Sequence, residues 1–143
     1  MQLSALGSRH IVSVAPSASV REVAGILAAR NVGSALVMDR GHLLGIVTDR
    51  DLVLRVLAAG LDPLRTTVEA VMSSPVVCAQ DDAGPQEAAA AMREHDVRRL
   101  PVQGEGNEIV GIVTLDDLVH HLGRTHADLA DVIAAFPVPH AGG

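Results

Sequence analysis

Two nearly identical octapeptides occupy residues 45–52 and 111–118 of this chain, displaced by 66 residues. The similarity reaches further, because residues 20–24 match residues 85–89 at an offset of 65. A repeat of this length indicates one supersecondary unit that is built twice. Each copy has about sixty residues, which is marginal for an independent core, so we expect the copies to fold against each other as a pseudo-symmetric pair.

Each copy shows the same order of predicted elements, namely strand, helix, strand, strand, helix. Capping residues, apolar stripes and polar turns mark the boundaries. The offset grows from 65 to 66 within residues 104–107, which predicts a hairpin turn that is one residue longer in the second copy. The fold class is therefore α+β. In the first copy we expect strands at 11–14, 35–38 and 43–47, and helices from 19 and at 48–60. In the second copy we expect strands at 76–79, 100–102 and 109–113, and helices from 85 and at 114–123.

We expect five regions along the chain. Pro63 ends any helical continuation of the first copy, and Gly123 is expected to stop the last helix of the second copy. The regions are a first repeat at 6–60, a linker at 61–69, a second repeat at 70–123, a short helix at 124–136 and a loose tail at 137–143.

The predicted C-terminal helix is capped by Thr125 and carries one apolar stripe that must be covered. It either folds back onto its own module or packs across a dimer interface. The stripe consists of Leu129, Val132, Ile133 and Phe136.

Composition limits the classes of partner. The net charge of −6 and the single aromatic residue argue against nucleic acid, which requires a basic footprint and, for single strands, stacking rings. No apolar run is long enough to span a bilayer and no signal segment opens the chain, so we expect a cytoplasmic protein. The lone Cys78 is expected to be a small buried residue.

The repeated Thr-x-x-Asp sequence at a strand-to-helix turn has two interpretations. In the first, Thr48 and Asp51 only cap their helix, as Thr114 and Asp117 do in the second copy. In the second, the unpaired amides of the helix start attract phosphate, the threonine hydroxyl adds a donor, and the aspartate accepts from a ribose diol. A glycine three residues before each threonine favours the second interpretation, because a missing side chain lets a ligand or another backbone approach.

These motifs are carried by both copies in the same order. Together with the Val-Arg-Arg-Leu-Pro-Val run at 97–102, the doubled Gly-apolar-x-Thr-x-x-Asp pattern resembles the cystathionine β-synthase (CBS) domain pair, also called a Bateman module. The resemblance covers residues 6–123. It implies a non-catalytic regulatory module that binds an adenosine-containing ligand (AMP, ADP, ATP, NAD or S-adenosylmethionine) in clefts between the repeats, forms a homodimer and signals to another protein.

The resemblance also implies ligand-contacting residues. Asp51 and Asp117 match the ribose-binding carboxylates, Thr48 and Thr114 the hydroxyls near phosphate, and Gly45 and Gly111 the positions of close approach. The base pocket matches Ser13, Ala35, Ala79, Arg99 and Leu100.

The two turns differ in charge. Arg50 stands in the first turn, where its guanidinium can pair with phosphate. In the second turn Asp116 adds a negative charge that would repel an anion unless Arg98 or Arg99 compensates for it. We therefore expect unequal affinities unless Arg50 is merely solvated, as surface charges often are.

Other functions are less well supported by the sequence. The histidines at 120, 121 and 126 have no ligand spacing for a metal, and no activated nucleophile or acid–base pair suggests an enzyme. No obligatory cofactor is expected. The alternative function is a protein-interaction module whose nucleotide pockets are vestigial.

Overall fold

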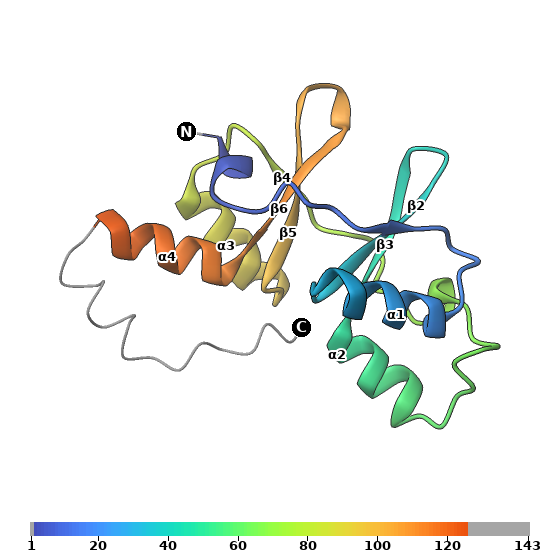
Figure 1. Ribbon diagram of the computed structural model, residues 1–143. Helices are drawn as coiled ribbons and strands as arrows, with labels where there is room; N and C mark the ends of the chain where they lie inside the picture. Colours follow the sequence, from blue (N-terminus) through green and yellow to red (C-terminus); the bar gives the residue numbers. More distant parts are fainter. Residues whose placement is uncertain (1, 126–143) are drawn as a thin grey trace. The chain divides into compact units, whose positions relative to one another are not determined.

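The computed structural model describes residues 2–125, which form two compact units (Figure 1). The first-repeat unit comprises residues 11–76. The second-repeat unit joins residues 2–10 to residues 77–125. Each unit contains one three-stranded sheet in the order predicted for its repeat, so the α+β class is confirmed.

The first-repeat unit has a parallel and an antiparallel strand pair in one sheet. The first strand pairs parallel to the second, and the second pairs antiparallel to the third. Its elements are β1 (Ser13–Val14), α1 (Val20–Arg30), β2 (Ser34–Asp39), β3 (His42–Thr48), α2 (Asp49–Leu52), a π-helical turn η2 (Val53–Leu57) and a 3₁₀ turn η3 (Val68–Ala70).

The second-repeat unit repeats this topology. Its elements are the 3₁₀ turn η1 (Leu3–Ala5), β4 (Ala79–Gln80), α3 (Pro85–His95), β5 (Arg99–Gln103), the 3₁₀ turn η4 (Glu105–Asn107), β6 (Ile109–Thr114) and α4 (Leu115–Thr125).

Local sequence explains where the first helix of each repeat begins and ends. The Ser19 hydroxyl accepts the Glu22 N–H at 3.1 Å, as predicted, and α3 has Pro85 at its first turn. Both helices end at a residue in the left-handed conformation, Asn31 and Asp96, each with a φ of 52°. Asn and Asp tolerate this conformation better than most residues, which makes them suitable helix stops.

The two hairpins differ in length, as the change of offset predicted. Arg40 and Gly41 both have positive φ (51° and 79°), the geometry of a tight two-residue turn between β2 and β3. Between β5 and β6 the chain instead makes η4, where Gly106 and Asn107 have positive φ. The inserted residue is therefore confirmed to lie in a hairpin loop.

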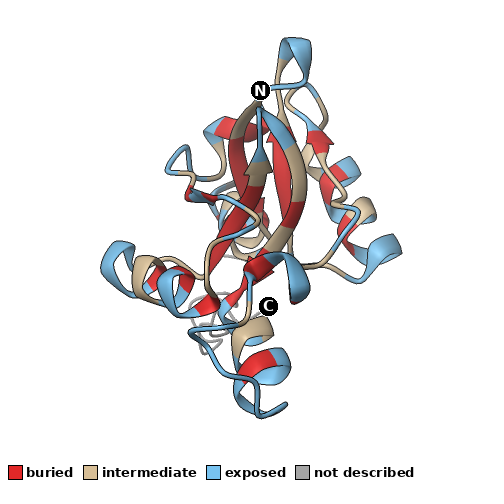
Figure 2. Cartoon of the chain, turned by 90° about the vertical axis from the view of Figure 1, so that its right-hand side faces the viewer, coloured by how far each residue is buried: buried red, intermediate tan, exposed pale blue. Residues whose placement is uncertain are grey.

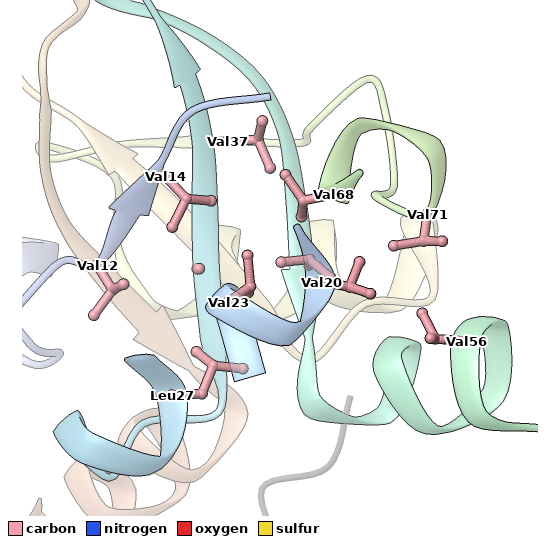
Figure 3. Close-up of a cluster of buried hydrophobic side chains, with 11 residues drawn as sticks. Val12, Val14, Val20, Val23, Leu27, Val37, Val56, Val68 and Val71 are labelled. Carbon is pink, nitrogen blue, oxygen red and sulfur yellow. The ribbon is translucent and has the colours of Figure 1, made fainter. Parts of the chain in front are cut away.

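The core of the first-repeat unit consists largely of valines (Figure 3). Val20, Val23 and Leu27 line the buried face of α1 and meet the sheet. Figure 2 shows that the strands carry many of the buried residues, whereas exposed residues mark hairpin tips and outer helix faces. The second core contains larger side chains, namely Leu3, Met92, Leu100 and Leu118, beside Ala79, Ala88, Val102 and Val113.

The first residues of each repeat pair with the sheet of the other repeat. Ser8 exchanges two backbone hydrogen bonds of 2.9 Å with Ile112 of β6. At the corresponding positions, Ser73 exchanges bonds of 2.9 and 3.1 Å with Ile46 of β3. The compact units are therefore offset from the sequence repeats, because residues 2–10 pack with the second repeat and residues 67–76 with the first.

Two predicted helix details are wrong. The expected stop at Gly123 does not occur, since α4 continues to Thr125 and Gly123 is not among the described glycines with positive φ. Gly123 is buried inside the helix, so packing outweighs its unfavourable propensity of about 1 kcal/mol. Thr125 is thus a residue of α4 and not the cap of a separate helix. The remainder of the predicted helix 124–136 and the tail 137–143 lie outside the described residues. Between residues 2 and 125, no helix is long and apolar enough to cross a membrane.

Candidate functional site

The two Thr-x-x-Asp turns form the same reciprocal pair of hydrogen bonds. Thr48 Oγ1 accepts the Asp51 N–H at 3.1 Å, and Asp51 Oδ2 accepts the Thr48 N–H at 2.9 Å. In the second turn the corresponding distances between Thr114 and Asp117 are 3.2 and 2.8 Å. Both turns are therefore capping boxes, and the structural interpretation of the motif is confirmed.

The capping bonds leave some groups available to a ligand. Each carboxylate uses Oδ2 for the cap, so Oδ1 keeps its capacity as an acceptor. In the first turn the Arg55 Nε lies 3.8 Å from Asp51 Oδ1. Arg55 also donates from Nη1 to the Val71 carbonyl at 2.8 Å, which ties η2 to residues 67–76. Arg55 was not predicted from the sequence, although its position four residues after Asp51 is the spacing of an ion pair on a helix.

The expectation of unpaired amides at the helix start is wrong for the first turn. The Asp49 N–H donates to the Gly33 carbonyl at 3.0 Å, and the Arg50 N–H donates to Asp49 Oδ1 at 2.9 Å. With Asp51 bonded to Thr48, the first three amides of α2 are all satisfied within the chain. A side-chain acceptor next to the helix start competes with any phosphate for these donors.

The second turn differs at the decisive position. Leu115 replaces Asp49 and offers no carboxylate, although its own N–H still donates to the Arg98 carbonyl at 2.8 Å. The first and third amides of α4 are thus satisfied as in α2, while the second amide, that of Asp116, lacks the carboxylate acceptor found in the first turn.

The strand opposite each turn supplies a different residue. Ser34 is the register partner of Thr48, and Arg99 is the register partner of Thr114. Ser34 is buried, whereas Arg99 is half-buried. The structure therefore places Arg99 on the strand opposite Thr114, whereas the cation of the first turn is Arg55, which pairs with Asp51 and follows it on the same helical segment. Arg50, by contrast, is exposed.

The close approach permitted by the two glycines is made by the chain itself. A Cβ built on Gly45 would lie 2.3 Å from Met72 Sδ and 3.0 Å from the Ser73 carbonyl oxygen. At Gly111 it would lie 3.0 Å from the Ser8 carbonyl oxygen. These contacts account for both glycines without a ligand.

The residues expected in the base pocket are mostly core residues. Ala35 and Leu100 have no exposed surface, and Ala79 is 8% exposed, so their side chains belong to the hydrophobic clusters of their units. Ser13 alone of the β1 and β4 candidates is exposed. Backbone groups, which sequence does not distinguish, remain the means by which Ala35, Ala79 and Leu100 can contact a ligand.

Burial raises the pKa of the Cys78 thiol. A raised pKa lowers the fraction of thiolate near neutral pH, and the thiolate is the reactive form. Cys78 is half-buried just before β4, which agrees with a packing role. Residues 2–125 contain no group of three His, Cys, Asp or Glu side chains arranged to hold a metal ion.

Comparison with known proteins identifies the repeat. The CBS domain family model matches residues 3–58 and 68–124. The CBS domain-containing protein YhcV of Bacillus subtilis is 38% identical over 109 residues, which is 76% of each chain. Hypoxic response protein 1 of Mycobacterium tuberculosis is 43% identical over 84 residues, 59% of this chain and 58% of that relative.

Solved structures agree with the sequence comparison. The CBS domain pair of protein MJ0100, in complex with 5′-methylthioadenosine and S-adenosyl-L-methionine, superposes with a TM-score of 0.77 at 26% identity, covering 88% of this chain and 98% of that one. The chain therefore belongs to the CBS domain family and carries the domain twice, which accounts for its doubled topology and doubled turn.

Proposed function

We propose that this chain is a non-catalytic regulatory module that binds adenosine-containing ligands at its Thr–Asp turns. The observation that carries the proposal is the pair of matching capping boxes at Thr48–Asp51 and Thr114–Asp117, each with a carboxylate oxygen outside the capping bonds. The similar MJ0100 domain pair binds two adenosine compounds, which supports the same ligand class here.

The chemistry of the turn fits a ribose better than a free base. A carboxylate Oδ1 can accept hydrogen bonds from both hydroxyls of a ribose cis-diol. The neighbouring threonine hydroxyl can donate a hydrogen bond to a phosphate oxygen or to a ribose oxygen of a sulfonium compound. Asp51 and Asp117 are half-buried, so a hydrogen bond there is less exposed to competing water. The likeness of the two turns supports one ligand class for both, with AMP, ADP, ATP, NAD and S-adenosylmethionine as members.

The second turn is proposed to bind more tightly. Arg99 stands opposite Thr114, and the Asp116 amide lacks the carboxylate acceptor that Asp49 provides in the first turn. Both features favour an anionic ligand at α4. The charge of Asp116 opposes them, so the difference between sites is modest.

A second function is a protein-interaction module with vestigial pockets. It is favoured by the satisfied amides of α2 and by the burial of Ala35, which leave the first turn few groups for a ligand. Under either function the module is proposed to act in the cytoplasm as a homodimer and to pass its signal to a separate effector protein.

Thermal-shift titration with AMP, ADP, ATP, NAD and S-adenosylmethionine separates the two functions. A ligand at a hundred times its Kd stabilises the folded state by about 2.7 kcal/mol. The variants Asp51→Asn and Asp117→Asn keep an oxygen that can accept the cap N–H and remove only the charge. We expect Asp117→Asn to lose more affinity than Asp51→Asn. If no adenosine compound shifts the unfolding temperature, the vestigial-pocket function is correct instead.

A further inference from the structure

The second-repeat unit contains a cavity of about 480 Å³ that belongs to neither Thr–Asp turn. It is bounded by the N-terminal segment, the residues that follow β4 and the β5–β6 hairpin. Its volume lies within the range of about 300–1,000 Å³ that is typical of small-molecule sites. Val110, which lines it, stands four residues before Thr114 on β6, roughly 14 Å away along a strand.

The lining of this cavity is strongly acidic. Four carboxylates line it, against one guanidinium, that of Arg9. The carboxylates are those of Asp81, Asp82, Glu105 and Glu108.

Asp81 is held in place by three hydrogen bonds. Its Oδ1 accepts the Ser4 N–H at 2.8 Å, and its carbonyl accepts the Leu3 N–H at 2.9 Å. Its own N–H donates to the Gln103 carbonyl of β5 at 2.9 Å. Asp81 thus joins the N-terminal segment to the sheet and forms a rigid wall of the cavity.

Glu108 is positioned by the shape of the hairpin. A Cβ built on Gly104 would lie 2.7 Å from Glu108 Oε1, so the carboxylate lies over bare backbone. The Gly104 N–H donates to the Glu108 carbonyl at 2.9 Å, which closes the loop. This carboxylate therefore occupies a space that any larger residue at 104 would take from it.

Ser4 adds a buried polar group to the same lining. Ser4 is 2% exposed and lines the cavity. Within residues 2–125 its backbone N–H bonds to Asp81, and its hydroxyl takes part in no hydrogen bond. A buried hydroxyl without a partner costs free energy that a ligand can recover.

The first repeat lacks three of these four carboxylates. Pro16 and Ser17 stand where the second repeat has Asp81 and Asp82, and His42 stands where it has Glu108. The loop that carries Glu105 contains the inserted residue. The acidity is therefore a property of the second copy and not a requirement of the shared fold.

The distribution of charge selects the kind of cation. A metal ion needs several ligands that converge on one point, and the described residues contain no such group. Carboxylates spread around a cavity of this volume instead match several cationic groups held apart by a carbon chain. Each ammonium can then form charge-assisted hydrogen bonds with a separate carboxylate.

We propose that the acidic cavity of the second-repeat unit binds an aliphatic polyamine, a chain with two or more ammonium groups. Asp82, Glu105 and Glu108 supply charge, Ser4 supplies a hydroxyl acceptor, and Asp81 forms the rigid wall. The site is separate from the Thr–Asp turns, so the full module accepts a polyamine and an adenosine ligand independently.

Calorimetric titration of the full chain with spermidine and putrescine tests the proposal, at about 150 mM salt to screen long-range attraction to the net charge. We expect saturable binding that weakens about tenfold in Glu105→Gln and in Glu108→Gln, since a charge-assisted bond contributes about 1.5 kcal/mol or more. Glu94→Gln is the matched control, because it removes the same charge from the exposed surface of α3 in the same unit. Arg9→Gln should strengthen binding by removing a like charge.

Three outcomes would overturn the polyamine site. Equal weakening in Glu94→Gln and Glu108→Gln would mean non-specific attraction. Displacement of spermidine by equimolar Mg²⁺ would indicate a point-charge site, and weaker binding in Arg9→Gln would indicate a ligand that carries its own anion. Asp117→Asn should leave spermidine binding unchanged, so failure of the adenosine site and failure of this site are distinguishable.

Discussion

The two units share a turn and differ in nearly everything around it. Both close the helix start with a Thr–Asp capping box of almost the same geometry. Around the box, Asp49 gives way to Leu115, and Ser34 gives way to Arg99. The capping bonds are therefore part of the fold that both copies share, whereas the residues around each turn differ and give each copy its own binding chemistry.

The largest effect should come from the segment that enters the second-repeat unit. In Gly7→Ala the new Cβ would lie 2.1 Å from the Ile112 carbonyl oxygen, and backbone cannot move aside as a side chain can. We expect the free energy of unfolding to fall by about 2–3 kcal/mol. Hydrogen exchange should accelerate at the Ser8 and Ile112 amides and not at the Ile46 and Ser73 amides.

Gly25→Ala is the control for this substitution. Gly25 lies inside α1, and its nearest neighbour is the flexible end of the Arg21 side chain at 3.2 Å. Alanine favours the helix by up to about 1 kcal/mol, so this variant should be neutral or more stable. If Gly7→Ala proved as harmless as Gly25→Ala, the packing of residues 2–10 on the second unit would be contradicted.

A smaller effect, equal in the two units, should follow removal of the caps. Thr48→Ala and Thr114→Ala each leave an Asp amide without its acceptor, at a cost of about 1 kcal/mol. Thr→Ser at either position keeps the hydroxyl and should recover most of the loss. Denaturant melts of all four variants measure this. Costs that differ by more than about 1 kcal/mol would show that the turns are not structurally equivalent.

The smallest effect concerns the thiol before β4. Because burial raises the pKa of Cys78, we expect it to react with a disulfide reagent at pH 8 more slowly in the folded than in the unfolded protein. A raised pKa stabilises the fold below the ordinary thiol pKa, and this contribution is lost as pH rises through the folded value.

The first repeat offers a matched position for this measurement. Ser13 corresponds to Cys78 and is exposed. The double variant Cys78→Ser, Ser13→Cys should therefore react faster than the natural chain. Equal rates would mean that the burial of Cys78 does not protect it.

Local signals in the sequence predicted most of the elements. The caps at Ser19, Thr48 and Thr114 and the longer second hairpin were all confirmed, because each depends on residues a few positions apart. The antiparallel pairing within each hairpin was also predicted, because only a short polar turn separates the two strands. Short-range chemistry is therefore well predicted here.

Features that depend on distant residues could not be predicted. Ser8 and Ser73 occupy equivalent positions near the start of their repeats. The sequence therefore gives no reason for either residue to pair with the sheet of the other repeat. The π-helical turn at Val53–Leu57 likewise has no recognisable sequence signal. The Thr–Asp pairs of the candidate site were predicted and Arg55 was not. The burial of Ala35 and Leu100 could not be predicted either, because burial depends on the whole unit.

The pairing of residues 2–10 with the second repeat has a consequence for synthesis of the protein. Residues 11–76 are continuous, so all the segments of the first unit leave the ribosome one after another. Residues 2–10 are made before residues 11–76, yet their partner Ile112 is about a hundred residues downstream, a delay of roughly 5–20 s at ordinary translation rates. During synthesis, residues 2–10 must therefore remain without their β6 partner until Ile112 has emerged.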